Sequence, residues 1–286
     1  MMATAVRRVA IRPLVLKPLA ILAHAPAVAT GNVIVDSLLA GTCPADSRLP
    51  VGRTTSRHPH DAGRQERARG WHLMSGIPPD YDADPGRWQS WESPQDVHQL
   101  IAPELRGPVL DVGSGEGRLA GLLGEGVTWI GVDSSSTQLA ANPFQPVILA
   151  DMRALPFRDG AFAEVVHLWC LYHVDEPAVA VSEAHRVLRP GGRYYASSSA
   201  RTNDPEIMFE GYPHSSFDAE EAVSIVGSVF DHVESERWDA KFFPLRTRDE
   251  VRAYCRHNFI PADRAEDADL PLWLTKRGVL VRARKT

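Results

Sequence analysis

The sequence predicts an α/β fold in which a mostly parallel sheet carries helices on both faces. Between residues 109 and 199, short apolar runs of strand length alternate with segments of helical character. This alternation is typical of parallel strands joined by crossover helices. The first run leads into a glycine-rich turn, and acidic residues follow the second and third runs. Because open α/β sheets bind ligands beyond the carboxyl ends of their strands, these features predict a ligand site at that edge.

The first strand and its turn read VLDVGSGEGR over residues 109–118. Three glycines at alternate positions let a ligand approach bare backbone, and helix-forming residues follow at 118–123. The spacing is Gly-x-Gly-x-Gly, not the Gly-x-Gly-x-x-Gly of dinucleotide-binding proteins, although Gly121 keeps that alternative open. Asp111, near the end of the strand, would repel a diphosphate and attract a cationic ligand. The turn therefore favours a ligand with positive charge.

The remaining elements are predicted from apolar runs and capping signals. Further strands are expected at residues 129–133, 146–152, 163–170, 193–197, 232–238 and 278–284. Helices are expected at residues 93–105, after the serines 134–136, and at 178–188, 217–230 and 247–257. In the last of these, Thr247 and Glu250 are spaced as a capping box.

Five features follow one another in a recognisable order: the glycine turn, the acids after the second and third runs, the fourth run, and the phrase AHRVLRPGG at residues 184–192. On these features the sequence resembles the class I S-adenosylmethionine-dependent methyltransferases of the small-molecule, methyltransferase-11-like type. The resemblance covers residues 109–199 well and the flanks loosely. It implies a Rossmann-like sheet of seven strands whose last strand is antiparallel, with S-adenosylmethionine as the cofactor.

The resemblance also implies where the cofactor is held. The glycine turn would wrap the amino-acid part, and Asp111 would reach its ammonium group directly or through water. Asp133 would accept hydrogen bonds from the ribose hydroxyls, and Asp151 would cap the adenine amino group. The cofactor-binding residues expected on this basis are Asp111, Gly113, Ser114, Gly115, Gly117, Asp133, Ser134, Asp151, Met152 and Leu168. Ser114 departs from the cysteine that many relatives carry, a change we expect to leave binding unaffected.

His173 is the best catalytic base that the sequence offers, because it follows the fourth strand at the ligand edge and a histidine titrates near neutrality. Its alternative role is in packing or hydrogen bonding. His167, inside the apolar fourth run, is expected to be a core residue. Contacts to the substrate are expected from Tyr81, Trp88, Tyr172, Tyr212 and His214. The three cysteines are too few and too scattered for a metal cluster.

Charge divides the chain of 286 residues into two parts. Residues 1–73 hold ten Lys and Arg against four Asp and Glu, a net charge of +6, and are expected to be a disordered basic extension. A basic interaction tail and a targeting peptide are the alternatives. Residues 79–286 are expected to be the methyltransferase domain, with residues 239–277 inserted between the last two strands.

The composition limits the classes of binding partner and the cellular compartment that we expect. Residues 74–286 carry a net charge of −11, a poor match for nucleic acid, whose binding depends on neutralising phosphates. A small-molecule substrate is favoured instead. The low cysteine content indicates a reducing, cytoplasmic setting, and no apolar run approaches the length needed to cross a bilayer. The oligomeric state is not predicted.

The predicted reaction is direct displacement, in which the enzyme aligns the acceptor with the methyl group and positioning carries most of the catalysis. Two alternatives stay open. The first is an NAD-dependent oxidoreductase, which would reuse Gly121 and Asp133. The second is a non-catalytic module that keeps the cofactor fold for binding.

Overall fold

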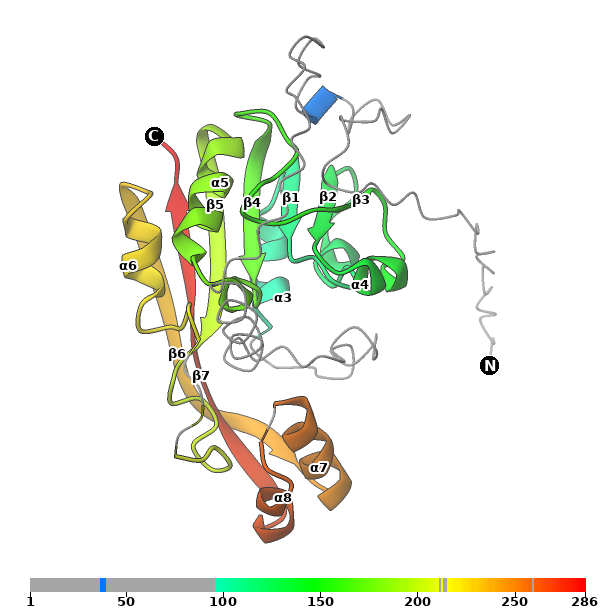
Figure 1. The fold of residues 1–286 in the computed structure, drawn as a ribbon, viewed down its shortest axis with the longest axis vertical. Coiled ribbons are helices and arrows are strands. Elements are labelled where there is room, and N and C mark those ends of the chain that lie inside the picture. Colours follow the sequence, from blue (N-terminus) through cyan, green and yellow to red (C-terminus); the bar gives the residue numbers. More distant parts are fainter. Residues whose placement is uncertain (1–36, 40–95, 211, 213–214, 259) are drawn as a thin grey trace, which may run out of the picture.

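A seven-stranded sheet forms the centre of the protein in the computed structural model, which describes residues 37–39, 96–210, 212, 215–258 and 260–286 (Figure 1). The strand order is β3-β2-β1-β4-β5-β7-β6. Strands β1 to β5 are parallel, and β7 runs antiparallel to both β5 and β6. The predicted Rossmann-like sheet with an antiparallel last strand is confirmed. The strands are β1 Val109–Val112, β2 Trp129–Asp133, β3 Val147–Leu149, β4 Phe162–Leu168, β5 Leu188–Ser199, β6 His232–Leu245 and β7 Leu272–Arg284.

Helices cover both faces of this sheet, as predicted. One core cluster joins α5 and α6 to one face, and a second joins α3 to the other. Consecutive residues of β4 contribute to opposite clusters, Val165 to the first and Val166 to the second, because side chains alternate along a strand. The described helices are α3 Val97–Ile101, η2 Ala102–Glu104, η3 Ala120–Leu122, α4 Ser136–Ala141, η4 Leu171–His173, α5 Pro177–Val187, α6 Ala222–Gly227, α7 Arg248–His257 and α8 Asp263–Asp267.

Capping residues set several of these boundaries. The Ser135 side chain accepts a hydrogen bond from the Gln138 backbone N–H and begins α4. The predicted capping box of α7 is present, with Thr247 as N-cap and Glu250 bonding back to it. Proline at the first helical position begins α5, where no backbone N–H is needed.

Three helices are shorter than predicted. Residues 118–123 form a turn and the 3₁₀ helix η3 instead of an α-helix. Gly117 has a φ of +84°, and Gly121 and Gly124 add backbone freedom that opposes helix formation. The helix predicted over 217–230 is confined to α6. The helix predicted over 93–105 is α3 followed by η2, with Asp96 as the N-cap.

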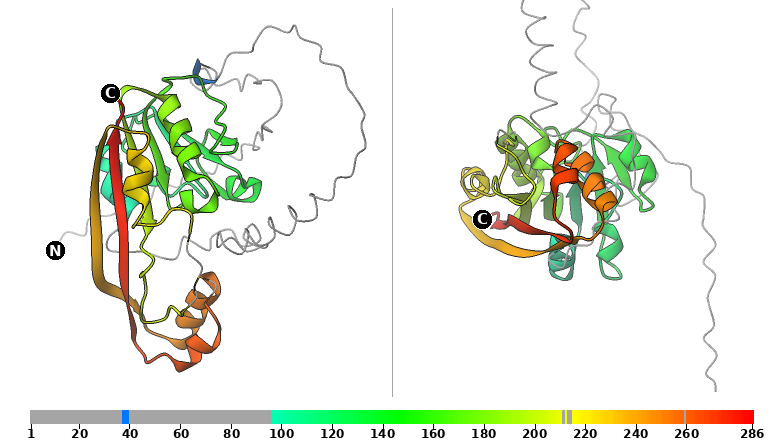
Figure 2. Two further views of the ribbon diagram at one scale, coloured as in Figure 1. Left: turned by 60° about the vertical axis from the view of Figure 1, so that its left-hand side comes forward. Right: turned by 90° about the horizontal axis from the view of Figure 1, so that it is seen from below.

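The last two strands continue well past their predicted ends. Pairing between β6 and β7 runs from His232↔Arg284 to Leu245↔Leu272, so part of the predicted 239–277 insertion is a two-stranded ribbon. Figure 2 shows this ribbon extending beyond the other strands to α7 and α8. A third core cluster lies there, and the loop after β5 contributes Ile207 to it. We refer to the ribbon end, α7, α8 and residues 200–210 and 212 as the lobe.

Most of the predicted N-terminal extension lies outside the described residues. Residues 37–39 are described, and there Leu39 forms an antiparallel bridge with Phe157 while Leu38 is buried in the core. Within the described part of the chain, no helix is long and apolar enough to cross a membrane.

Candidate cofactor site

The glycine turn leaves the carboxyl end of β1 in a conformation that suits glycine. Gly113, Gly115 and Gly117 have φ angles of +73°, +49° and +84°, a region that other residues rarely adopt. A Cβ atom on Gly113 would lie 2.5 Å from the Cβ atom of Cys170. The backbone N–H groups of Gly113 and Ser114 both donate to the carbonyl oxygen of Val132, at 2.8 and 3.0 Å. The turn is therefore held against β2 on one side and against the end of β4 on the other.

Asp111 lies buried in β1 and is hydrogen-bonded to an indole from the next strand. The Trp129 Nε1–H group donates to Asp111 Oδ2 at 3.2 Å. Burial raises the pKa of Asp111 to about 7, and the neighbouring charge of Asp133 adds to the shift while the indole bond opposes it. A cation at this position would favour the charged carboxylate, because opposite charges attract strongly where water is excluded.

Asp133 ends β2 and touches the glycine turn directly. Its Oδ2 atom accepts from the Gly115 backbone N–H at 2.9 Å, and its Oδ1 atom accepts from the Ser135 N–H at 2.9 Å. The Asp133 carbonyl oxygen accepts from the Ala150 N–H at 3.0 Å, which brings the end of β3 alongside. The predicted acids after the second and third strands therefore lie on neighbouring strands at one edge.

The remaining predicted cofactor residues differ in their surroundings. Asp151 is half-buried and pairs with Arg153 at 2.7 Å, and this bond lowers its pKa. Met152 packs partly buried against the core, and Leu168 is buried in the core cluster of the α3 face. Ser134 is exposed. The Ser114 hydroxyl is buried and forms no hydrogen bond among the described residues.

The end of β4 brings the predicted base to the same edge. His173 ends the short helix η4, and its backbone N–H donates to the Cys170 carbonyl oxygen at 3.0 Å. Its ring lies 4.4 Å from the ring of Tyr172. Trp169, the first residue after β4, has a φ of +58°. Non-glycine residues held in this conformation concentrate at functional sites.

His167 is a core residue, as predicted. It is fully buried in β4, and a hydrogen bond of 3.0 Å joins its Nδ1 atom to the Tyr194 hydroxyl. Burial lowers its pKa to about 3.

The predicted substrate residues are only partly described. Tyr81, Trp88 and His214 lie outside the described residues. Tyr212 packs in the lobe against Phe209, and its hydroxyl donates to the Asn258 carbonyl oxygen at 3.0 Å. Its contacts are therefore with the lobe, and a direct role at the substrate stays a prediction.

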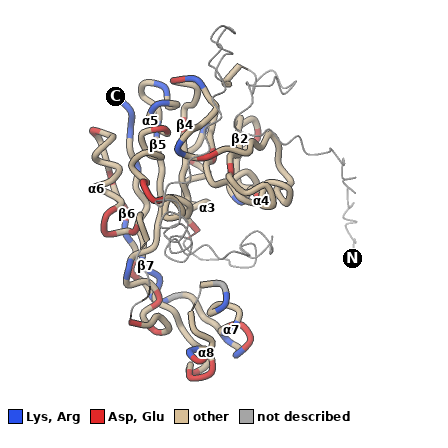
Figure 3. The backbone as a smooth tube through the Cα atoms, in the orientation of Figure 1, with Lys and Arg blue, Asp and Glu red and all other residues tan. Residues whose placement is uncertain are grey.

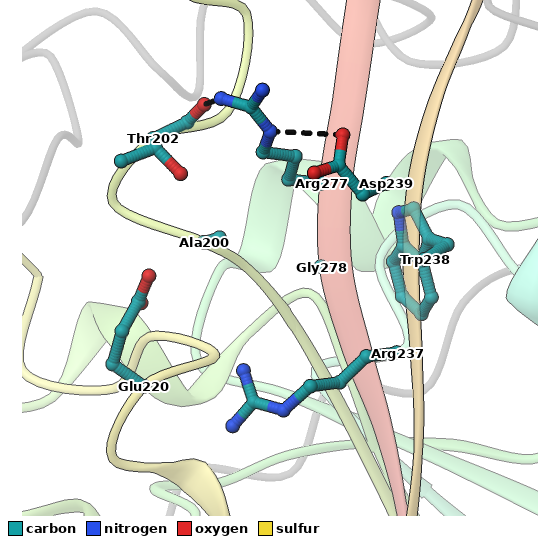
Figure 4. A pocket seen from close by; sticks show the side chains of 8 residues that line it. All are labelled: Ala200, Thr202, Glu220, Arg237, Trp238, Asp239, Arg277 and Gly278. Atoms are coloured by element: carbon teal, nitrogen blue, oxygen red, sulfur yellow. Dashed lines mark hydrogen bonds and ion pairs between the residues drawn. The ribbon is translucent and has the colours of Figure 1, made fainter.

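A separate pocket of about 260 Å³ opens between the loop after β5 and the ribbon (Figure 4). Arg277 crosses one wall and forms an ion pair with Asp239 at 3.0 Å, while Arg237 and Glu220 also line the pocket. The pocket is lined by Ala200, Thr202, Glu220, Arg237, Trp238, Asp239, Arg277 and Gly278. None of the predicted site residues lines it.

The residues at the sheet edge fit a cationic nucleoside better than a dinucleotide. Binding of a diphosphate relies on a helix that begins directly after the glycine turn, whereas here the next described α-helix is α4. Two carboxylates, Asp111 and Asp133, flank the turn and would repel a diphosphate. A Cβ atom on Gly113 or Gly117 would collide with its neighbours. Within the described ranges, no group of three or more His, Cys, Asp and Glu side chains could hold a metal ion.

The sequence did not identify several residues that shape the turn. Asn142 donates to the Gly115 carbonyl oxygen at 2.9 Å, Trp129 binds Asp111, and Cys170 packs under Gly113. Gln138 is buried close to Gly115. Their contacts are long-range, so spacing along the chain carries little signal for them.

The fold and site define a Rossmann-like domain with a glycine turn and two carboxylates at the ends of its first strands. A family model described as "Methyltransferase domain" matches residues 110–196. A demethylmenaquinone methyltransferase of Symbiobacterium thermophilum is 30% identical over 159 residues, covering 48% of this chain and 61% of the relative. Residues 110–196 therefore belong to the class I S-adenosylmethionine-dependent methyltransferases. S-adenosylmethionine is the cofactor of this domain.

Other relatives match smaller parts. An arsenite methyltransferase of Aquipseudomonas alcaligenes is 33% identical over 120 residues, covering 34% of this chain and 35% of the relative. An uncharacterised 37.1 kDa protein in transposon Tn4556 of Streptomyces fradiae is 39% identical over 95 residues, 29% of this chain and 28% of the relative. The chain thus spans less than two thirds of the length of these relatives.

Among solved structures, the YcgJ protein of Bacillus subtilis aligns with a TM-score of 0.49 at 19% identity, over 66% of this chain and 96% of that protein. A phosphoethanolamine N-methyltransferase 2 of Haemonchus contortus, in complex with S-adenosyl-L-methionine, aligns with a TM-score of 0.48 at 17% identity. The alignment covers 74% of this chain and 60% of that protein.

Proposed function

We propose that this protein transfers a methyl group from S-adenosylmethionine to a small-molecule acceptor. The observation that carries the proposal is the glycine turn between two carboxylates, with Asp111 on β1 and Asp133 on β2. Such an edge suits a ligand that bears both a positive charge and a ribose. When bound, S-adenosylmethionine supplies a methyl group on a positively charged sulfur.

Each predicted cofactor residue then has a role that its surroundings support. Gly113, Gly115 and Gly117 would lie against the amino-acid part; an added Cβ would collide with Cys170 at Gly113 and with Asn142 at Gly117. Asp111 would hold the ammonium group, and this contact would favour its charged form. Asp133 would accept from the ribose hydroxyls at the end of β2, where its carboxylate also accepts from the Gly115 and Ser135 backbone N–H groups.

The adenine end is expected at β3 and β4. Asp151 would accept the adenine amino group in addition to its bonds from Arg153. Met152, in the turn after β3, is half-buried, and Leu168, at the end of β4, is buried; apolar groups of this kind suit the face of a base. Ser114 and Ser134 complete the set at the turns after β1 and β2.

The acceptor is proposed to be a small molecule. Asp and Glu outnumber Lys and Arg, and both signs occur on the sheet domain and on the lobe (Figure 3). This distribution favours a small acceptor over a polyanion such as nucleic acid. The named relatives act on demethylmenaquinone and on arsenite, which is consistent with this class of acceptor.

His173 is proposed as the base for acceptors that must lose a proton. It lies half-buried at the ligand edge, beside Tyr172. Geometry favours it, because η4 places it directly after the strand that neighbours β1. His173→Gln should lower the rate of methyl transfer by about 10² to 10⁴-fold if the histidine removes a proton. Unchanged turnover would assign it to packing.

Calorimetry with S-adenosylhomocysteine tests the cofactor site. Asp133→Ala should weaken binding by about 1–3 kcal/mol, the scale of lost hydrogen bonds to a charged group. Glu236→Ala, on the exposed strand β6, is the matched control and should bind normally. Equal affinity of Asp133→Ala and the wild type would contradict the proposed position of the ribose.

Two further measurements separate the alternatives. A thermal shift with S-adenosylhomocysteine but none with NAD would exclude the oxidoreductase, since a ligand of the folded state raises the melting temperature. Incubation with isotope-labelled cofactor and a metabolite extract, followed by mass spectrometry, would identify the methylated acceptor. Binding without any methylated product would instead favour a non-catalytic module.

A further inference from the structure

Asn142 joins the end of α4 to the glycine turn. It is the C-cap residue of α4, and its side chain is buried, with 5% of its surface exposed. Its Nδ2 group donates to the Gly115 carbonyl oxygen at 2.9 Å, and its Oδ1 atom accepts from the Phe144 backbone N–H at 2.9 Å. The second bond fixes which end of the amide faces Gly115, because only the oxygen can accept from a backbone N–H.

The same side chain also confines Gly117. A Cβ atom on Gly117 would lie 2.4 Å from Asn142 Oδ1 and 2.8 Å from the Phe144 ring. Asn142 therefore touches the second and third glycines of the turn at once. No spacing rule along the sequence links Asn142 to a turn 27 residues earlier.

Gly115 is consequently held through both of its peptide groups. Its N–H group donates to Asp133, and its carbonyl oxygen accepts from Asn142. Both partners belong to the same β2–α4 unit, which is closed by the bond from the Ser135 N–H to Asp133. The β2–α4 unit thus holds both peptide groups of a segment that glycine would otherwise leave flexible.

We propose that Asn142 is a positioning residue for the cofactor turn, which fixes the peptide plane after Gly115 and confines Gly117 before the cofactor arrives. The inference rests on the proposed function, because the turn is taken as the cofactor cradle. Ordering a glycine segment during binding would weaken affinity, and a turn that is ordered in the free protein avoids that loss. Asn142 has no contact with cofactor in this proposal and acts through Gly115 and Gly117.

The test measures S-adenosylhomocysteine binding by calorimetry on the full chain and its variants. Asn142→Ala should raise the Kd by about 10-fold, the effect of one lost hydrogen bond. Asn142→Asp keeps the size of the side chain and an acceptor for Phe144, but it places an oxygen against the Gly115 carbonyl. This variant should also raise the Kd by about 10-fold or more, and it replaces Asn142→Ala if the latter does not fold.

A matched control separates positioning from general stability. Asn258 is also a helix C-cap, and its Nδ2 group donates to the Tyr254 carbonyl oxygen at 3.0 Å in the lobe. Asn258→Ala should lower the melting temperature without changing the Kd. Hydrogen exchange in the free protein should become faster at the amides of residues 115–117 in the Asn142 variants and stay unchanged in Asn258→Ala.

The outcomes are distinct. A wild-type Kd in both Asn142 variants, or unchanged exchange at residues 115–117, overturns the positioning role. A Kd raised equally by Asn258→Ala also overturns it, because general loss of stability would then explain the effect. Absence of binding by the wild type would count against the proposed function instead, and exchange at the turn would still decide whether Asn142 orders it.

Discussion

The indole of Trp129 reaches Asp111 on the neighbouring strand by crossing over a glycine. Asp111 pairs in register with Gly131, which lies two residues after Trp129 on β2. A Cβ atom on Gly131 would lie 2.5 Å from the indole ring and 2.7 Å from the Ser114 hydroxyl. The absent side chain thus makes room for the only hydrogen bond to the Asp111 side chain that we find among the described residues.

Compared with the wild type, the Asp111→Asn variant should gain stability as the pH rises. The folded state raises the pKa of Asp111 from 3.8 to about 7. Between these values the carboxyl is protonated when folded and ionised when unfolded, so rising pH favours unfolding. Each pKa unit corresponds to about 1.4 kcal/mol. The unfolding free energy of the variant relative to the wild type should therefore increase by up to about 4 kcal/mol from pH 4 to pH 7, measured by urea denaturation.

Trp129→Phe provides the control for this titration. Removing the indole N–H eliminates the bond that lowers the pKa of Asp111, so the pH-dependent loss of stability should extend above pH 7. A difference between Asp111→Asn and the wild type that does not vary with pH would show that Asp111 has an ordinary pKa.

Gly113→Ala should destabilise the protein more than alanine at Gly124 or Gly126, neither of which has an atom within 4 Å of an added Cβ. A positive φ costs an alanine about 1 kcal/mol, and the collision with Cys170 adds an overpacking cost of about 1–3 kcal/mol. Gly126 has a φ of +82° but nothing within 4 Å of an added Cβ, and Gly124 has neither constraint. The loss of unfolding free energy should increase in the order Gly124→Ala, Gly126→Ala, Gly113→Ala. Equal losses at Gly113 and Gly126 would show that the Cys170 contact carries no cost.

Sequence was sufficient where local rules decide structure. The glycine turn, the acid at the end of β2, the capping box at Thr247 and the buried His167 all follow from spacing or hydrophobic pattern. It was insufficient where tertiary contacts decide. The pairing of β6 with β7 extends through residues that have little strand pattern, because the lobe core stabilises their far ends.

The site shows the same division. Asp133 was predicted from its place in the chain, yet its bond to Gly115 depends on how β1 and β2 align. Asn142, in an Asn-Pro pair after a helix, reads as a helix end, and its contact with the turn exists only in three dimensions. The places of the glycine turn and of the acids after the strands were therefore predictable, whereas the residues that support the turn were not.

The lobe contains a buried charge cluster that ties the loop after β5 to the ribbon. Lys276 Nζ lies 2.8 Å from Asp204 Oδ1 and 2.6 Å from the Tyr254 hydroxyl, which also donates to Asp204. Asp204 has no exposed surface and a φ of +54°. Burial raises the pKa of Asp204 and lowers that of Lys276, so each ion depends on the other to stay charged.

Lys276→Met should therefore destabilise the protein strongly, because it leaves the Asp204 carboxylate buried without its counter-ion. The loss in unfolding free energy should be about 3–5 kcal/mol in urea denaturation. Asp204→Asn should cost a similar amount, and the double variant should cost less than the two single losses combined, since neither charge is then left alone. Arg252, which pairs with Glu266 at 2.7 Å on the exposed side of the same lobe, is the control, and Arg252→Met should change stability far less, because water screens an exposed ion pair. Additive losses for Asp204 and Lys276 would show that the two ions are stabilised independently.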